Sequence, residues 1–386
     1  MSHRTRLDQG DDATARDVVA YYHQPVKGPL LREAFLPFAD RCTERGLTVR
    51  VERHWLHGPH LRLCLRGPAE RVAAAAADGA ATVRDWVGDH PSVGGPGPEQ
   101  LLAQAAEAGR LELIPPPYDP VLPDNTVRVE RVDLAPLRAL LGSDAVTLRN
   151  DLLRLGLPAL RAASGFLGEH GDGAAARLQL AATALAAHAA AHPGGLVGGH
   201  YSYVSHLEDF LVHDDPDGRI RDAFAEHWQR AGGAVTALVG RITDGRDTGW
   251  EQEWAAWSRS AWQLTEGRRA AGANLTGDPG AYRARAGATG DPATAERWDG
   301  ELRTRFSEFH RLLRRSDPEG AMWSRPAYLV HRASTNTLYR LLAICDLAPL
   351  ERYLAAYLVV RAVPVLTGHD WRTEVTAVVD AVERAS

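Results

Sequence analysis

Residues 49–66 carry three histidines and four arginines in two short runs that meet at Gly58-Pro59. Imidazoles exchange protons near neutral pH, and guanidinium groups bind carboxylates, phosphates and carbonyl oxygens. Both runs alternate between apolar and polar residues, which is typical of half-buried strands, and a Gly-Pro pair is typical of a turn. The pattern therefore predicts a β-hairpin with a cationic face.

The pairing register of this hairpin decides which arginine needs a partner, because a shift by one residue exchanges the two faces. In one register Arg53 lies opposite Arg62, and these like charges require a bridging anion or carboxylate. In the other register Glu52 lies opposite Arg62, the apolar residues share one face, and Arg53 projects from that face. The second register packs better, yet it leaves a guanidinium in need of a partner. A structural salt bridge and an anion-binding site are both open interpretations of Arg53.

A second candidate for proton transfer is His331. The preceding run Tyr328–Val330 is apolar and resembles a strand, and Ser334, Thr335 or Asn336 can serve as the N-cap of a following helix. We therefore expect His331 at the mouth of that helix, where it can act as a general acid or base. A capping or buried structural histidine is the alternative.

Other motifs argue mainly against metal and nucleotide chemistry. His188 and His192 have the four-residue spacing of metal ligands, but alanines surround both, so packing or surface roles are favoured. The chain has no Walker A loop, no Gly-x-Gly-x-x-Gly, no His-Glu-x-x-His, no Cys-x-x-Cys and no Gly-x-Ser-x-Gly. Nucleotide hydrolysis, dinucleotide redox chemistry and zinc hydrolysis are therefore disfavoured.

Composition indicates an ordinary soluble globular protein. The chain has 386 residues, of which 45% are hydrophobic and 24% charged, with a net charge of −5. No apolar run is long enough to span a membrane and no signal peptide is visible, so we expect a cytoplasmic location. The charge gives no general attraction to nucleic acid or to a membrane. The three cysteines are widely spaced and are expected to be buried thiols.

The elements that must position these residues predict an α+β fold. A strand at 18–22, a helix at 30–45, the hairpin at 49–66 and an alanine-rich helix at 70–87 give an early antiparallel sheet packed against helices. The proline-rich stretch 111–125 is a candidate hinge, or a wall of a substrate groove. The C-terminal half is mostly helical. The expected division is 1–125 and 126–386, unless the two form one continuous domain.

The hairpin and the late histidine together resemble the C-terminal domain family of lanthipeptide dehydratases, which includes stand-alone thiopeptide pyridine synthases. The early motif of that family is matched by Arg53-His54-Trp55 followed by Gly58-Pro59-His60-Leu61-Arg62, and the late motif by Ser324, His331 and Asn336. Asn336 lies five residues after His331 where the family has four, and Cys64 replaces the last arginine of the early motif.

The resemblance implies an enzyme that matures a ribosomally made precursor peptide without a metal or organic cofactor. Its expected reaction is β-elimination of glutamate from glutamylated Ser or Thr, a lyase activity, with His331 transferring a proton. Arg53 and Arg62 would bind the glutamyl carboxylates or a peptide carbonyl. Further substrate contacts are expected from His60, Trp55, Ser324, Asn336 and Tyr118.

The resemblance also leaves three alternatives open. The chain could be a cyclase that forms a pyridine from dehydroamino acids, or one that forms lanthionine without zinc. It could instead be a non-catalytic protein that binds the leader peptide. The expected partners are the precursor peptide and a glutamylating dehydratase subunit.

Overall fold

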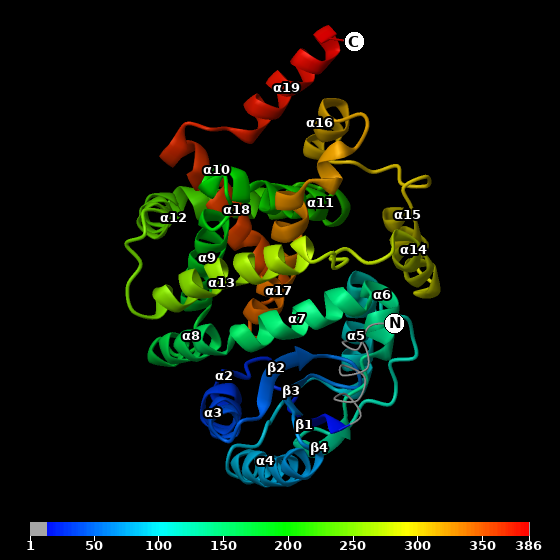
Figure 1. Cartoon of the computed structure of the whole chain (residues 1–386), viewed down its shortest axis with the longest axis vertical. Coiled ribbons are helices and arrows are strands. Elements are labelled where there is room, and N and C mark those ends of the chain that lie inside the picture. The colour runs from blue at the N-terminus through cyan, green and yellow to red at the C-terminus, as the bar shows by residue number, and fades with distance from the viewer. Residues whose placement is uncertain (1–13, 386) are drawn as a thin grey trace. The chain divides into compact units, whose positions relative to one another are not determined.

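The computed structural model describes residues 14–385 and confirms the α+β prediction, since one small antiparallel sheet near the N-terminus accompanies a mostly helical chain (Figure 1). The chain divides into two compact units. Unit 1 takes in the chain up to Asp172 together with Gly277–Trp298 and Ala343–Asp346. Unit 2 comprises Gly173–Thr276, Asp299–Leu342 and the chain from Leu347 onward. The proline-rich stretch 111–125 therefore lies inside unit 1.

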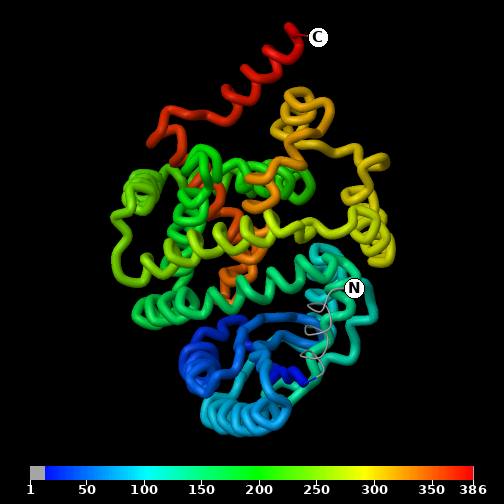
Figure 2. The backbone as a smooth tube through the Cα atoms, viewed as in Figure 1, coloured from blue at the N-terminus to red at the C-terminus, as the bar shows by residue number. Residues whose placement is uncertain are grey.

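The sheet of unit 1 has four antiparallel strands in the order β2-β3-β1-β4. One face carries the leucines of the strands and all of their valines except Val19, and it packs against α3 and α4. Helix α7 packs beside β2 (Figures 1 and 2). Alternation with a period of two places these apolar side chains on one side and leaves the other side polar. The strands are β1 (Arg16–Tyr21), β2 (Thr48–His54), β3 (His60–Arg66) and β4 (Thr126–Arg131).

The remaining elements of unit 1 are helices. In α4, Gly79 allows the ring of Phe38 from α3 to pack against the helix, because a Cβ at Gly79 would lie 2.5 Å from that ring. The helical elements are α2 (Gly28–Leu30), η1 (Leu31–Phe35), α3 (Leu36–Glu44), α4 (Ala69–Asp89), α5 (Pro98–Glu112), α6 (Ala135–Leu141), α7 (Ser143–Leu155), α8 (Leu157–Glu169), α14 (Pro279–Ala288) and α15 (Pro292–Trp298).

Unit 2 is built from helices around α9 and α18. Both are rich in alanine, valine and leucine on all sides, and this composition suits helices that are covered by others. Helix α12 packs on both, and α13 packs on α9. The elements are α9 (Ala174–Ala190), α10 (Gly195–Gly199), α11 (Tyr201–Asp214), α12 (Arg219–Thr243), α13 (Trp250–Ala270), α16 (Glu308–Ser316), η2 (Ala321–Ser324), α17 (Pro326–Ile344), α18 (Pro349–Thr367) and α19 (Trp371–Ala385).

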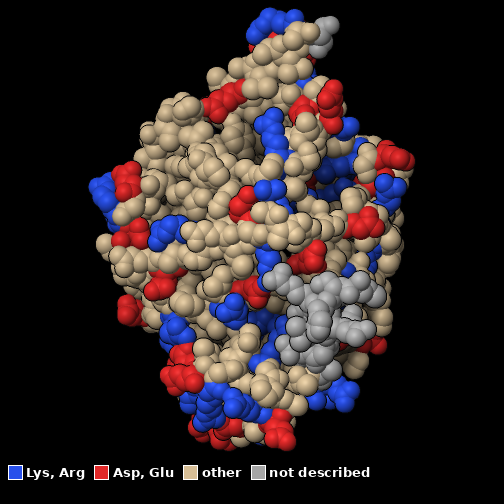
Figure 3. Space-filling view, viewed as in Figure 1, with Lys and Arg blue, Asp and Glu red and all other residues tan. Residues whose placement is uncertain are grey.

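The charges on the surface and the character of the helices are consistent with the mixed composition of the chain. Basic and acidic side chains are interspersed on the face drawn in Figure 3. Among residues 14–385, no helix combines the length and the apolar character needed to cross a membrane.

Candidate functional site

The hairpin adopts the second of the two registers, with Glu52 opposite Arg62 and His54 opposite His60. Arg53 therefore projects from the apolar face of the sheet, as that register requires. The turn is possible because Gly58 has a φ of 114°, a conformation that favours glycine. Its amide donates to the carbonyl of Trp55 at 3.0 Å, which closes the turn.

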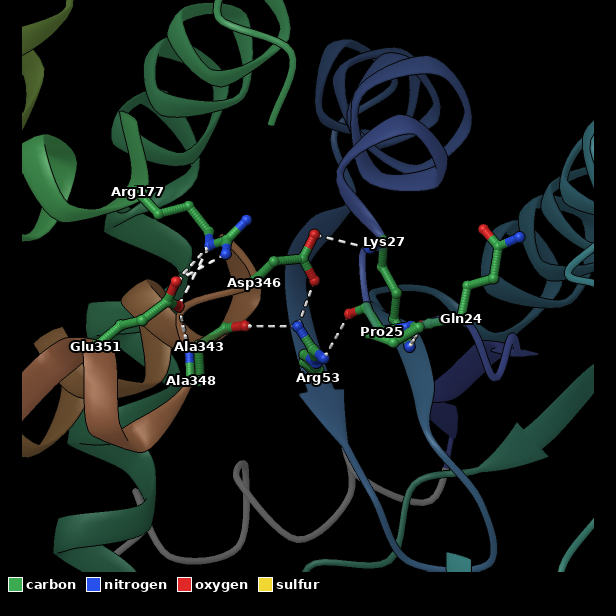
Figure 4. Close-up of polar contacts among 9 residues, drawn as sticks. All are labelled: Gln24, Pro25, Lys27, Arg53, Arg177, Ala343, Asp346, Ala348 and Glu351. Carbon is green, nitrogen blue, oxygen red and sulfur yellow. Dashed lines mark hydrogen bonds and ion pairs between the residues drawn. The ribbon is translucent and has the colours of Figure 1, made fainter. Parts of the chain in front are cut away.

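The partner of Arg53 is Asp346, which follows α17 and belongs to unit 1 (Figure 4). The guanidinium donates to the Asp346 carboxylate, to the carbonyl of Ala343 at 3.3 Å and to the carbonyl of Pro25 at 3.0 Å. The Asp346 side chain is 4% exposed and that of Arg53 is 25% exposed. Arg53 thus has a structural salt bridge, and its positive charge is already balanced.

Asp346 also holds Lys27, whose backbone amide donates to the second carboxylate oxygen at 2.7 Å. The Lys27 side chain is fully buried, and its ammonium donates to the carbonyl of Gln24 (Figure 4). Burial lowers the pKa of Lys27 to about 7, and the nearby Arg53 lowers it as well. A lysine with this pKa is only partly protonated at neutral pH, so it adds less than a full positive charge beside Arg53.

Arg62 and His60 form a second paired group on the polar face of the sheet. His60 Nδ1–H donates to the carbonyl of Gly58 at 2.8 Å, so its Nε2 accepts from Arg62 at 2.7 Å. Arg62 also forms an ion pair with Asp17 at 3.5 Å. Burial, and then Arg62, hold the pKa of His60 well below 6.5. His60 is therefore a neutral acceptor that orients Arg62.

Arg53 projects from the opposite face of the sheet to His60 and Arg62. Trp55 and Tyr118 are the other two predicted site residues in unit 1. Their rings meet edge to face with centroids 5.8 Å apart, and the Tyr118 hydroxyl donates to the carbonyl of Ile114 at 3.0 Å. The indole Nε1 of Trp55 is buried and has no hydrogen-bond partner among residues 14–385. All five residues belong to unit 1.

His331 belongs to unit 2 and lies inside α17, not at the mouth of a helix after a strand. The expected strand at Tyr328–Val330 is wrong, because Pro326 begins the helix and those residues form its first turns. Ser334 and Thr335 do not cap a helix either. Their hydroxyls donate back to the carbonyls of Val330 and His331, as such side chains do in helix interiors.

His331 packs among other aromatic rings in a histidine cluster of His188, His192 and His331. The ring of His188 stacks on it with centroids 4.5 Å apart and an angle of 13°, and His192 meets it edge-on at 5.3 Å. Tyr203 and Trp262 lie farther out, at 6.4 Å each. His188 is 1% exposed and His331 is 5% exposed.

The hydrogen bonds of His188 and His331 define which ring nitrogen carries the proton. Thr335 Oγ1 donates its hydrogen to a carbonyl, so it accepts from His188 Nε2–H at 3.0 Å. His331 Nε2–H donates to the carbonyl of Gly199 at 3.0 Å. Both rings are therefore left with an Nδ1 lone pair, and neither Nδ1 has a hydrogen-bond partner among the described residues.

Burial holds the pKa of His331 well below 6.5, and the neighbouring His188 and His192 lower it further. Burial also lowers the pKa of His188 to about 3, and His192 adds to that effect. Both rings are neutral at pH 7, and a buried acceptor without a donor costs about 1–3 kcal/mol. The two Nδ1 atoms are thus suited to accept a hydrogen bond from a ligand.

Ser324 and Asn336 do not contact this cluster through any hydrogen bond in the described part of the chain. Ser324 ends η2, is exposed, and donates to the carbonyl of Ala321 at 2.8 Å. Asn336 is exposed on α17. Their predicted contacts with substrate stay predictions.

Sequence patterns missed three of these residues. Asp346 forms the ion pair with Arg53, and Lys27 lies near it, but neither residue belongs to a recognisable sequence motif. His188 was singled out only by its metal-ligand spacing from His192, and the surrounding alanines favoured a surface or packing role. No group of three or more His, Cys, Asp or Glu among residues 14–385 is placed to hold a metal ion.

Comparison with known proteins places the chain by its fold. No family model matches the sequence, and no curated protein matches it. Two solved structures have the same fold over nearly their whole length. The pyridine synthase TbtD from thiomuracin biosynthesis superposes with a TM-score of 0.66 and 20% identity, over 92% of this chain and 99% of that one. TsrL superposes with a TM-score of 0.62 and 16% identity, over 94% of this chain and 98% of that one.

Proposed function

We propose that this chain is a maturation enzyme for a ribosomally made peptide and that it closes a pyridine ring from two dehydroalanines. The observation that carries the proposal is the fold shared with a pyridine synthase, which extends over 92% of this chain and 99% of the other. The pairing of Arg53 with Asp346 also favours cyclisation, because a cation already neutralised is poorly suited to bind a departing glutamate carboxylate.

The reaction requires proton transfer and positioning. The amide before one dehydroalanine takes its imidic acid form, and the resulting C=N–C=C unit adds across the second alkene. One new bond joins the two methylene carbons, and the other joins the imidic carbon to the second α-carbon. The ring becomes aromatic by losing water, which carries the imidic oxygen, and the leader peptide, which leaves as its amide.

We assign the proton transfer to His331. Its Nδ1 lone pair would accept the amide N–H proton and return it to the carbonyl oxygen, which forms the imidic acid. Arg62, held by His60, would donate to a peptide carbonyl, and Trp55, Tyr118, Ser324 and Asn336 are proposed to contact the peptide. Holding the two alkenes in contact would supply much of the rate enhancement.

The decisive experiment follows the mass of a precursor peptide that contains dehydroalanines. Release of the leader as its amide, with loss of one water from the core, is the expected result. Ring closure without mass change, detected as loss of a free thiol, would identify a lanthionine cyclase instead. Binding of the leader without any product would show a non-catalytic partner.

Glutamate elimination is the second candidate, and one observation favours it. Arg62 Nε is buried and has no hydrogen-bond partner among residues 14–385, so it could receive a carboxylate oxygen. The test uses the same precursor with glutamylated Ser or Thr. If glutamate is lost from this peptide and the dehydrated peptide does not change, the enzyme catalyses elimination and not cyclisation.

The variant His331→Asn separates catalysis from binding. Turnover should fall by about 100-fold or more, as is usual when a general base is removed, while the peptide still binds. The matched control is His227→Asn, a partly exposed histidine on α12. Unchanged turnover in His331→Asn would remove this histidine from the mechanism.

A further inference from the structure

Strands β2 and β4 contain the same six residues and occupy opposite edges of the sheet. Thr48–Arg53 and Thr126–Arg131 both read Thr-Val-Arg-Val-Glu-Arg. In the order β2-β3-β1-β4, each is an outer strand with one hydrogen-bonded neighbour. Differences between the two edges therefore come from their surroundings and not from their composition.

The β2 edge is covered and its charges are satisfied. Helix α7 packs beside it, and Arg149 from α7 binds Glu52. Arg50 binds Glu52 at 2.8 Å. Burial raises the pKa of Glu52, but Arg149 and Arg50 outweigh this effect and hold the pKa well below 4.5.

In the part of the chain that the structure describes, the β4 edge lacks these partners. Arg128 and Arg131 are exposed, and the apolar side chain of Val129 is 43% exposed. Among residues 14–385, neither Arg128 nor Glu130 forms an ion pair, and Glu130 has only a 3.5 Å contact from the Tyr21 hydroxyl. An uncovered edge strand presents free backbone N–H and C=O groups, which are a template for another strand.

We propose that β4 pairs antiparallel with β4 of a second copy of this chain, so that two sheets of four strands join into one of eight. Charge complementarity favours this pairing. With the two-fold axis at Val129, Arg128 lies opposite Glu130 of the partner subunit, and the symmetry repeats the pair. The second copy thus supplies to Glu130 the cation that α7 supplies to Glu52. This interface does not depend on the proposed reaction.

Charge reversal on the full-length chain tests this register. Both Arg128→Glu and Glu130→Arg place like charges opposite each other twice, so each variant alone should dimerise about tenfold more weakly or worse. An equimolar mixture of the two variants restores opposite charges at both positions and should recover dimers. Sedimentation equilibrium over a range of concentrations and salt measures this, and added salt should weaken the wild-type dimer.

Arg131→Glu is the matched control, because residue 131 lies opposite Val127 of the partner subunit in this register. It makes the same charge change on the same strand, and it should leave the dimer within about twofold of the wild type. Far-ultraviolet circular dichroism confirms that each variant is folded.

Three results would overturn the proposal. One is a wild-type chain that stays monomeric at all concentrations, and another is a dimer that is equally weakened by Arg131→Glu. The third is a monomer whose binding of an extended precursor peptide is lost in Arg128→Glu, because the edge would then bind peptide and not a second copy.

Discussion

His188 and His331 show how two histidines can remain neutral bases at a pH where free imidazoles begin to take up protons. Each donates its Nε2 proton to an oxygen, and each keeps an Nδ1 lone pair inside the protein. Two stacked rings 4.5 Å apart cannot both be charged at low cost, so His188 helps to keep His331 unprotonated. In this arrangement His188 is a positioning residue.

This role predicts a shift in the pH profile. Burial, the main cause of the low pKa of His331, remains in His188→Phe, but the electrostatic effect of His188 is lost, so the pKa of His331 should rise in part and stay below 6.5. A base works only when unprotonated, so the acid limb of kcat/KM should move to higher pH. Measurement of kcat/KM from pH 4.5 to 8 checks this. A lower rate with an unmoved acid limb would mean that His188 is only a packing residue.

The Arg53–Asp346 pair predicts a large stability effect from one small change. Asp346→Ala removes a carboxylate that is 4% exposed and leaves Arg53 unpaired, which should lower the free energy of unfolding by about 2–3 kcal/mol. This loss is smaller than for a fully buried ion pair because Arg53 is partly exposed. Urea titration measures it. Asp40→Ala breaks an exposed pair with Arg161 and should cost under about 1 kcal/mol.

Arg53→Leu combined with Asp346→Asn then tests whether Arg53 serves catalysis. The double change removes both charges, while an asparagine still accepts from the Lys27 amide and tolerates the φ of 63° at this position. A stable double variant that keeps its turnover would assign Arg53 a structural role. A stable but inactive one would return Arg53 to the substrate site.

At the level of elements, the hairpin is predictable from sequence because its signals are local. Alternation and the Gly-Pro turn lie within 18 contiguous residues, 49–66. The need of Arg53 for a partner also follows from the alternation. The identity of that partner does not follow, because Asp346 lies 293 residues away and carries no motif.

The short apolar run before His331 shows the opposite case. Such a run fits a strand or a buried helix equally well, and only its neighbours decide. In this chain the run forms part of a helix that begins at Pro326 and continues to Ile344. Strand β4 was absent from the expected elements although its residues alternate, since an alternating run of six after a proline-rich stretch is a weak signal.

The turn of the hairpin gives a prediction at this scale. Gly58→Ala combines a φ of 114° with a Cβ only 2.9 Å from His23 Nε2, so it should cost about 2–3 kcal/mol. Gly46→Ala shares the positive φ, 77°, but its Cβ would meet nothing within 4 Å, so about 1 kcal/mol is expected. Urea unfolding compares the two. Equal losses would mean that the contact with His23 relaxes freely.

For the whole molecule, the many buried histidines predict sensitivity to mild acid. Burial lowers the pKa of His188 to about 3 and that of His206 to about 4, and it holds the pKa of His331 well below 6.5. All three lie in unit 2. Above pH 6.5 neither the folded nor the unfolded chain binds these protons. Below it the unfolded chain takes up protons that the folded chain does not, so stability falls as the pH falls.

Each such histidine contributes at most about 1.4 kcal/mol per pH unit, so the three together should lower the free energy of unfolding by about 3–5 kcal/mol between pH 7 and pH 5. Urea unfolding at the two pH values measures the loss. The variant His206→Gln should show a smaller difference than the wild type. Equal unfolding midpoints at pH 7 and pH 5 would contradict the prediction.

The assignment of Ala343–Asp346 to unit 1 has a consequence for how the protein is made. A ribosome releases the hairpin early, but the carboxylate that neutralises Arg53 emerges 293 residues later. Until then the nascent sheet carries an unpaired guanidinium on the face that must become apolar. Unit 1 can therefore reach its final stability only after nearly all of the chain has been synthesised, although its strands come first. Truncated chains that end before Asp346 should be the ones that depend most on chaperones.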